Sequence, residues 1–363
     1  MREASESGSG NMYGFPRCHV LCIAEIGNVR LEISESMVSF TLGTRSYSCG
    51  DNFDWQISGE DLPVKPPSLF KYYSLSDYNY DALLNQYVYA SHPFYLNDLL
   101  DCSENLLRWD SIEDAKALFG NLYAQIEELP KEDISEIALK GYIGVRFNEC
   151  GILSLTSSPT NPMLWALYTG NKGVCVEFDY NKFPFKKIGP FPINYVKESD
   201  FNVDKFPLSI GEFGESLSIF ILSNIKSTYW KVEDEWRLLK LSPLRESFIP
   251  PSQYVKPGDE SNWHNRKCKD SLDCVKSYTF GHMFFDGSVE IAPNQFEYYV
   301  SKNSDKNALL SLITHGYYCN LWKLYIIMYQ GISLKRHLIQ IIKLTDERFV
   351  FSLIDDNTQS ELK

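Results

Sequence analysis

The chain has 363 residues, of which 44% are hydrophobic and 23% are charged, a balance typical of folded globular proteins and not of disordered or fibrous ones. Its 47 acidic residues outnumber its 35 lysines and arginines, and the formal net charge of −12 argues against a nucleic-acid-coating protein. No apolar run reaches the roughly 18 residues that a membrane-spanning helix needs, since the best candidate, residues 321–334, is short and contains Lys323.

The N-terminus and the cysteines indicate a cytoplasmic protein without a metal centre. Residues 1–6 are acidic, whereas a secretory signal begins with basic residues. The nine cysteines are an odd number spread over a long chain, so we expect reduced thiols in the core and no disulfide framework. Their spacing lacks the paired CxxC of zinc ribbons, so we predict no metal site. The lack of a long apolar run predicts no membrane partner.

Four segments follow one another along the chain. Residues 1–14 are rich in Ser, Gly and Glu and are predicted to be loose. Residues 15–62 contain short β-rich runs separated by turns, which indicates a small antiparallel sheet. A proline-marked linker then leads to a main α+β domain over residues 66–300, and residues 301–363 are predicted to form a C-terminal helix and a hairpin.

The main domain and the C-terminal segment alternate between strand and helix patterns. We predict helices that begin near Ser76, Asn161 and Ser304, with Gly170 ending the second of them, and two further helices over residues 93–140 and 214–227. The predicted strands cover residues 69–74, 87–91, 151–156, 174–179, 193–197, 232–241, 289–292, 338–344 and 348–354. This order predicts an α+β fold: a mixed, mostly antiparallel sheet with helical insertions, preceded by a small β-rich N-terminal segment.

The strongest chemical motif lies in residues 226–237. If residues 232–241 form a strand, its period of two places Glu233, Glu235 and Arg237 on one face. The two acids would lie about 7 Å apart, so one could hold its proton while Arg237 keeps the other ionised. Such a row can position a substrate hydroxyl or stabilise a developing cation. The alternative is that this face is solvent-exposed or forms a cross-strand lattice of ion pairs.

Two aromatic stretches could complete a site. Trp165 and Tyr168 are three residues apart in the predicted helix, share one face, and could stack a flat ring such as a base or a nicotinamide. Their alternative role is in the core. In the strand 69–74, alternation places Lys71 and Tyr73 opposite Phe70 and Tyr72, and an enclosed lysine would need a partner.

These three stretches, in this order, resemble the bacterial family catalogued as domain of unknown function 2971. The family is characterised by a Lys-Tyr strand, an Asn-Asp turn, a Met-x-Trp-x-x-Tyr helix followed by glycine, and a Lys…Trp-x-x-Glu-x-Glu-x-Arg segment. The resemblance covers about residues 66–241. Two features depart from it: Leu99 replaces a proline after Asn97-Asp98, where Asp101 can supply the acid that follows, and Leu167 replaces a histidine. The most specific matches are Met163, Trp165, Tyr168, Gly173, Trp230, Glu233, Glu235 and Arg237.

The layout is also similar to that of ADP-ribosyltransferases, an analogy at the level of the fold. It implies an enzyme that acts on a nicotinamide dinucleotide, with NAD as co-substrate, and a role as a toxin or phage-defence effector. Glu235 or Glu233 would then bind the ribose hydroxyl and stabilise positive charge, with Arg237 orienting the acids. The cofactor-binding residues would be Lys71 and Tyr72 beside the ribose or phosphate, and Trp165 or Tyr168 against the nicotinamide.

Three other interpretations compete with this enzyme. The same groove could recognise a small ligand or a protein partner without catalysis, or the motifs could be purely architectural. A hydrolytic nuclease could hold magnesium with Asp98, Asp101, Glu233 and Glu235. Rossmann hydride transfer and P-loop phosphate hydrolysis are disfavoured because their glycine-rich motifs are missing. Convergence of Lys71, Trp165, Tyr168 and Glu235 around one cavity would support a site, and their dispersal would support a purely architectural role.

Overall fold

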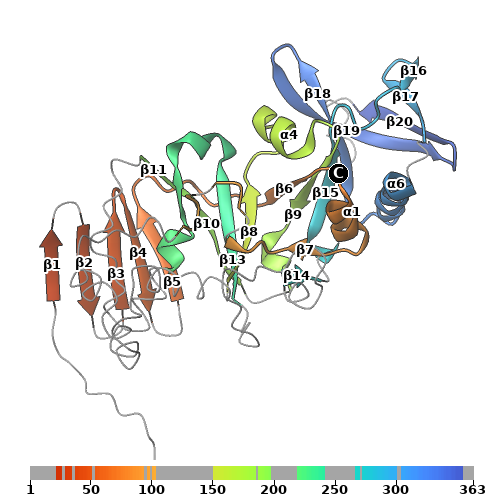
Figure 1. Cartoon of the computed structure of the whole chain (residues 1–363). Coiled ribbons are helices and arrows are strands. Elements are labelled where there is room, and N and C mark those ends of the chain that lie inside the picture. The colour runs from red at the N-terminus through yellow and green to blue at the C-terminus, as the bar shows by residue number, and fades with distance from the viewer. Residues whose placement is uncertain are drawn as a thin grey trace, which may run out of the picture.

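The computed structural model confirms the α+β class, with two large sheets, two two-stranded sheets and a few helices among the described residues (Figure 1). The structure describes residues 22–26, 29–34, 37–50, 54–93, 96–98, 100–103, 150–184, 187–197, 219–241, 266–269, 272–300 and 304–354. The predictions for residues 1–14 and for residues 104–140 of the long helix lie outside these residues.

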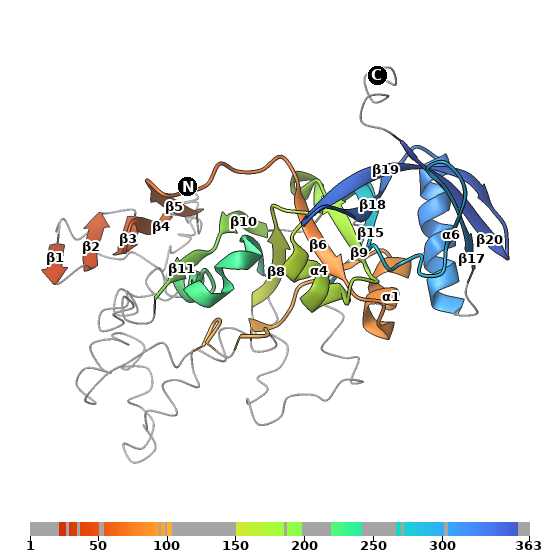
Figure 2. The same ribbon diagram turned by 90° about the horizontal axis from the view of Figure 1, so that it is seen from above.

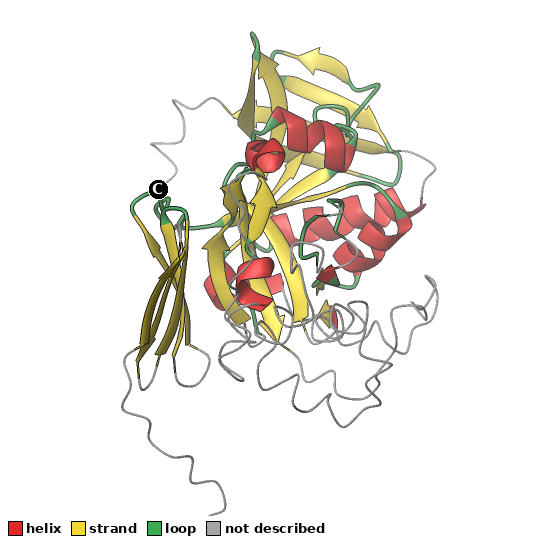
Figure 3. Ribbon diagram, turned by 60° about the vertical axis from the view of Figure 1, so that its left-hand side comes forward, coloured by secondary structure: helices red, strands yellow, loops and turns green. Residues whose placement is uncertain are grey.

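The β-rich N-terminal segment is an antiparallel five-stranded sheet in which each strand pairs with the next along the chain. Its strands are β1 (Cys22–Ile26), β2 (Val29–Ser34), β3 (Met37–Leu42), β4 (Arg45–Gly50) and β5 (Asp54–Gly59). Figures 1 and 2 show this sheet beside the β10 end of the main sheet, and Figure 3 shows it as a narrow layer without helices of its own. Phe220 links this sheet to the main sheet. Its ring stacks on that of Trp55 of β5, with 4.8 Å between the ring centres, and also packs against Phe191 of β10.

The main sheet has eleven strands in the order β10-β13-β8-β6-β9-β15-β18-β19-β20-β17-β16. Neighbours are antiparallel except β15 and β18, which are parallel. The C-terminal strands therefore continue the main sheet, and the predicted boundary at residue 300 falls within it. The strands are β6 (Leu69–Tyr73), β8 (Cys150–Thr156), β9 (Val174–Phe178), β10 (Lys187–Pro192), β13 (Glu235–Leu241), β15 (Val275–Phe280), β16 (Val289–Ala292), β17 (Gln295–Tyr299), β18 (Lys323–Gln330), β19 (Ser333–Leu344) and β20 (Arg348–Ile354).

Helices cover both faces of this sheet because its central strands are apolar on both sides. In β9, Val174 and Val176 belong to the large core that includes residues of α1 (Asp77–Leu84) and α6 (Ser304–Tyr318). Cys175, between them, faces the opposite side and packs with Phe70 and with Trp165 of α4 (Pro162–Thr169). The period of two thus separates a face covered by α1 and α6 from a face covered by α4.

The caps predicted for α4 are confirmed. The Asn161 side chain accepts hydrogen bonds from the backbone N–H groups of Met163 and Leu164 at 3.0 and 3.3 Å, and Pro162 occupies the first turn. Gly170 ends the helix in the left-handed region, with φ 57°. Local capping chemistry alone therefore sets the bounds of this helix.

Two predictions before β13 are wrong. Residues 228–233 form a 3₁₀ helix, η8 (Thr228–Glu233), which Asp234 closes with φ 46°, so the strand begins at Glu235 and not at residue 232. The predicted helix over 214–227 ends too late, because β12 (Ile225–Ser227) pairs in parallel with β11 (Asn194–Val196). Pairing with a distant strand overrides the local helical preference of these residues.

Strand β10 was not predicted because its sequence contains Gly189-Pro190, a pair that is unusual within strands. Proline cannot donate to a ladder and is tolerated at sheet edges and bulges. β10 lies at one edge of the main sheet, and its register with β13 shifts between Ile188 and Phe191. The remaining described elements are β7 (Val88–Tyr89), which pairs with β14 (Lys267–Cys268), and the 3₁₀ helices η5 (Tyr180–Lys182) and η12 (Leu272–Cys274).

Replacing Gly173 with alanine is expected to lower the free energy of unfolding by about 1–3 kcal/mol. A Cβ atom there would overlap the carbonyl oxygen of Tyr73 and lie 2.9 Å from the Cβ of Thr169. Gly170→Ala is the matched control, because that Cβ would meet nothing within 4 Å and only its positive φ costs about 1 kcal/mol. Urea unfolding of both variants checks this, and equal losses would rule out the steric explanation.

Candidate functional site

A cavity opens where two strands of the main sheet diverge. β6 and β8 are paired only at Phe70 and Thr156, and β8 then bridges to Ser91, whose backbone exchanges two 2.8 Å hydrogen bonds with Ile152. The cavity beside this split has a volume of about 240 Å³. Its lining is Phe70, Lys71, Tyr72, Ser91, Leu96, Asn97, Asp101, Ser154, Leu155, Thr156, Leu164, Tyr168, Lys226, Glu233, Glu235 and Arg237.

Arg237 joins two acids from distant segments at one wall of this cavity. Its Nε donates to Glu235 Oε1 at 2.7 Å, and its terminal nitrogens hold both oxygens of Asp101, one of them at 2.7 Å. A further hydrogen bond of 2.8 Å reaches the backbone carbonyl of Ser223. Only 1% of Arg237 is exposed, so its charge depends on these partners instead of on water.

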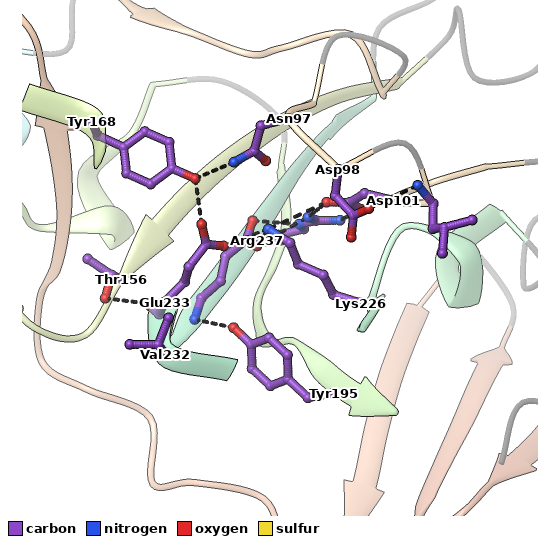
Figure 4. A network of polar contacts seen from close by, with 12 residues as sticks. Asn97, Asp98, Asp101, Thr156, Tyr168, Tyr195, Lys226, Val232, Glu233 and Arg237 are labelled. Carbon is purple, nitrogen blue, oxygen red and sulfur yellow. Dashed lines mark hydrogen bonds and ion pairs between the residues drawn. The ribbon is translucent and has the colours of Figure 1, made fainter. Parts of the chain in front are cut away.

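Lys226, from β12, is the second buried cation of the network. Its ammonium lies 2.6 Å from Glu233, 3.2 Å from Glu235 and 3.7 Å from Asp101, and 4.9 Å from the centre of the Trp230 ring. Two cations and three acids thus form one buried cluster, drawn in part in Figure 4. Glu233, Glu235 and Arg237 are buried, so the alternative in which they form a solvent-exposed face is wrong, and their ion pairs lie inside the protein.

Tyr168 connects this cluster to the mouth of the cavity. Its hydroxyl donates to Glu233 Oε1 at 2.5 Å and accepts from the Asn97 side chain at 2.7 Å (Figure 4). The bend at Asp234 brings Glu233 back to the wall, where its backbone carbonyl accepts from Thr156 at 2.9 Å. Hence Glu233 reaches the predicted place beside Glu235 through a 3₁₀ helix and not through strand alternation.

The charges of the cluster determine its protonation. Burial acts to raise the pKa of Glu235, but the charges of Arg237 and Lys226 outweigh burial and hold that pKa at about 2. Burial acts to lower the pKa of Lys226, yet the three acids together raise it. Burial and the hydrogen bond to Glu233 raise the pKa of Tyr168 well above its usual value. At neutral pH, Glu235 is therefore ionised beside two cations and a neutral phenol.

Most of the predicted site residues line this one cavity. Glu233, Glu235 and Arg237 form its charged wall, and Lys71, Tyr72 and Tyr168 also line it. Trp165 is the exception.

The prediction that Trp165 stacks on a ligand needs correction. Its side chain is 1% exposed, and its ring packs edge-on against Tyr72 at 5.1 Å. Its indole N–H donates to the Pro159 carbonyl at 2.9 Å. Trp165 therefore supports the aromatic wall from behind, and the rings that meet the cavity belong to Phe70, Tyr72 and Tyr168.

Sequence reasoning gave Lys226 no role, although this residue opens the Lys…Trp-x-x-Glu-x-Glu-x-Arg motif. Its importance follows only from burial, because a lysine that is 4% exposed must have anionic partners. The sequence suggests Asp101 as a replacement acid and as a magnesium ligand but not as a partner of Arg237, because that bond spans 136 residues of sequence. A motif that contains a lysine, two glutamates and an arginine already indicates a charge cluster, but its charges balance, so nothing in it points to Asp101.

Three of the acids that a magnesium-dependent nuclease would use are paired with the same two cations. Within the described ranges, no group of three or more His, Cys, Asp or Glu side chains is arranged to hold a metal ion. Asp101, Glu233 and Glu235 instead point to Lys226 and Arg237.

Among the described residues, none of the helices combines the length and apolar character needed to span a bilayer.

Comparison of this chain with models of protein families, with curated proteins and with solved structures found no match.

Proposed function

We propose that this cavity is the active site of an ADP-ribosyltransferase-like enzyme that acts on a nicotinamide dinucleotide. The observation that carries the proposal is an ionised carboxylate, Glu235, on the wall of a cavity that Lys71 and Tyr72 also line. A carboxylate that stays ionised stabilises the positive charge that develops on ribose as the glycosidic bond breaks. Consumption of the dinucleotide would fit a toxin or a phage-defence effector.

The proposed reaction needs no further reagent. The C–N bond between ribose and nicotinamide breaks, and its electron pair leaves with neutral nicotinamide. An acceptor hydroxyl or a water molecule forms the new C–O bond and gives its proton to solvent or to a carboxylate of the cavity. Water as acceptor makes the protein a hydrolase, whereas a hydroxyl of a macromolecule makes it a transferase.

A specific observation favours a second candidate, recognition of a ligand without catalysis. Both carboxylate oxygens of Glu235 already accept hydrogen bonds, one from Arg237 and the other from Lys226 and Arg237. These three hydrogen bonds occupy most of the roughly four acceptor sites of a carboxylate, which leaves Glu235 less able to bind a ribose hydroxyl. Thermal stabilisation of the protein by the dinucleotide, without release of nicotinamide, would select this candidate.

The test is incubation of the purified protein with NAD, measuring nicotinamide release and transfer of labelled ADP-ribose to protein. We expect Glu235→Gln to lower turnover about 100-fold, because the neutral amide cannot stabilise the developing positive charge. Glu177→Gln is the matched control: Glu177 is half-buried, pairs with Arg336 at 3.1 Å, and does not line the cavity. Absence of both NAD binding and NAD consumption by the unmodified protein would overturn both candidates.

A further inference from the structure

Lys71 differs from the other two cations of the cavity in its partners. Its ammonium donates one long hydrogen bond, of 3.5 Å, to the Ser154 carbonyl, and lies 5.8 Å from the centre of the Tyr73 ring. In the part of the chain that the structure describes, Lys71 forms no ion pair. An ammonium has three donors, and only this one hydrogen bond joins it to another described residue.

The position of Lys71 explains how a charged residue comes to lie within the sheet. Its neighbours Leu69 and Tyr73 are buried in the large core, and β9 covers the other edge of β6. The half-buried Lys71 lies at the split between β6 and β8, where the backbone of Ser154 has no strand-pairing partner on β6. The Lys71 side chain reaches solvent through the cavity that it lines.

The charge of the remaining cavity is balanced without Lys71. Asp101, Glu233 and Glu235 carry three negative charges, and each is paired with Lys226, Arg237 or both. Arg237 and Lys226 contribute two positive charges, so protonated Lys71 brings the lining to neutrality, but at a place where no acid contacts it. A charge that is partly withdrawn from water and has no ion-pair partner costs free energy that an incoming anion can recover.

We propose that Lys71 is the anion-binding group of this cavity and that it receives a phosphoryl group of the ligand. The inference rests on the proposed function in that it names the part of the dinucleotide that this lysine would hold. A volume of about 240 Å³ encloses one phosphorylated fragment and not a whole dinucleotide, since sites that bury drug-sized ligands span about 300–1,000 Å³. The rest of a dinucleotide must then extend through the mouth.

Protonation of Lys71 should control this binding near neutral pH. Burial lowers the pKa of Lys71 to about 8, although the charge of Glu235 opposes the change. The other groups around the cavity are Asp101, Glu233 and Glu235 among the acids, Lys226 and Arg237 among the cations, and Tyr72, Tyr73 and Tyr168 among the phenols. The pKa values of Glu235, Lys226, Arg237 and the three tyrosines all move away from the pH range around 8.

The experiment uses sulfate, a phosphate mimic that stays doubly charged from about pH 7 to about pH 9, and measures its affinity for the full chain by calorimetry. For a group with a pKa of about 8, the protonated fraction falls about tenfold over this range, and the affinity should fall equally. Lys71→Arg should bind sulfate with little pH dependence because arginine stays charged. Lys71→Met should lose binding, and Lys276→Met, outside the cavity, should not.

Each outcome of the sulfate titrations either supports or overturns the phosphoryl subsite at Lys71. Loss of binding in Lys71→Met together with a flat pH profile in Lys71→Arg supports the subsite. Equal affinity in the unmodified protein and Lys71→Met, or no sulfate binding at all, would overturn it. Circular dichroism shows whether a variant has folded, and Lys71→Arg still tests the pH dependence if the methionine variant has not.

Two further ligands separate this inference from the proposed function. ADP-ribose and inorganic pyrophosphate are titrated in the same way, and dependence of both affinities on Lys71 identifies the phosphoryl group as the common feature. Preference for ADP-ribose over pyrophosphate points to a nucleotide, and the reverse points to free phosphate. Sulfate binding through Lys71 without any NAD consumption would sustain the subsite and refute the enzyme.

Discussion

Replacing Arg237 with methionine is expected to lower the free energy of unfolding by about 3–5 kcal/mol. Methionine fills much of the same space, but it leaves Asp101 and Glu235 buried without the cation that neutralises them. Asp101 is 3% exposed and Glu235 5%, so water cannot take over the role of the guanidinium. Urea unfolding monitored by tryptophan fluorescence and by circular dichroism measures the loss.

Arg348→Met is the matched control for this effect. Arg348 pairs with Glu297 at 3.1 Å, but half of its side chain is exposed, and an exposed pair contributes at most about 1 kcal/mol. Arg237→Lys keeps the charge and loses the two-pronged contact with Asp101, so its loss should lie between the two. Similar losses for Arg237→Met and Arg348→Met would show that the cluster is hydrated and not buried.

The second large effect is expected in acid. The pKa of Glu235 is about 2 in the folded protein, against an ordinary value of 4.5. A lowered folded pKa contributes stability that is complete above the ordinary pKa and is lost as pH falls through the folded value. The difference corresponds to about 3 kcal/mol, lost between about pH 5 and pH 2. Urea unfolding at several pH values in this range measures it.

Glu235→Gln isolates this contribution because glutamine does not titrate. The variant should be less stable than the parent at neutral pH, and its stability should change less between about pH 5 and pH 2. Glu297→Gln removes an acid from the exposed pair with Arg348 and should leave the parent profile nearly unchanged. A Glu235→Gln profile parallel to that of the parent would mean that Glu235 is not the group that titrates.

The features that sequence alone determined are those whose causes lie within a few residues. Asn161, Pro162 and Gly170 fix both ends of α4 through caps and a left-handed turn. The predicted strands 289–292 and 348–354 coincide with β16 and β20. Because such patterns alternate along the chain, the mixed, mostly antiparallel α+β fold could also be predicted.

The convergence of Lys71, Tyr72, Tyr168, Glu233, Glu235 and Arg237 at one cavity could be proposed from their motifs, but only the tertiary structure decided which side chains meet there. Asp101 and Lys226 join the cluster because β8 pairs with β13, β6 separates from β8 after one residue pair, and β12 pairs with β11. Trp165 packs behind Tyr72 for the same kind of reason, through contacts between elements remote in sequence. Register and the depth of a side chain depend on long-range pairing, whereas caps and strand periodicity depend on neighbours in the chain.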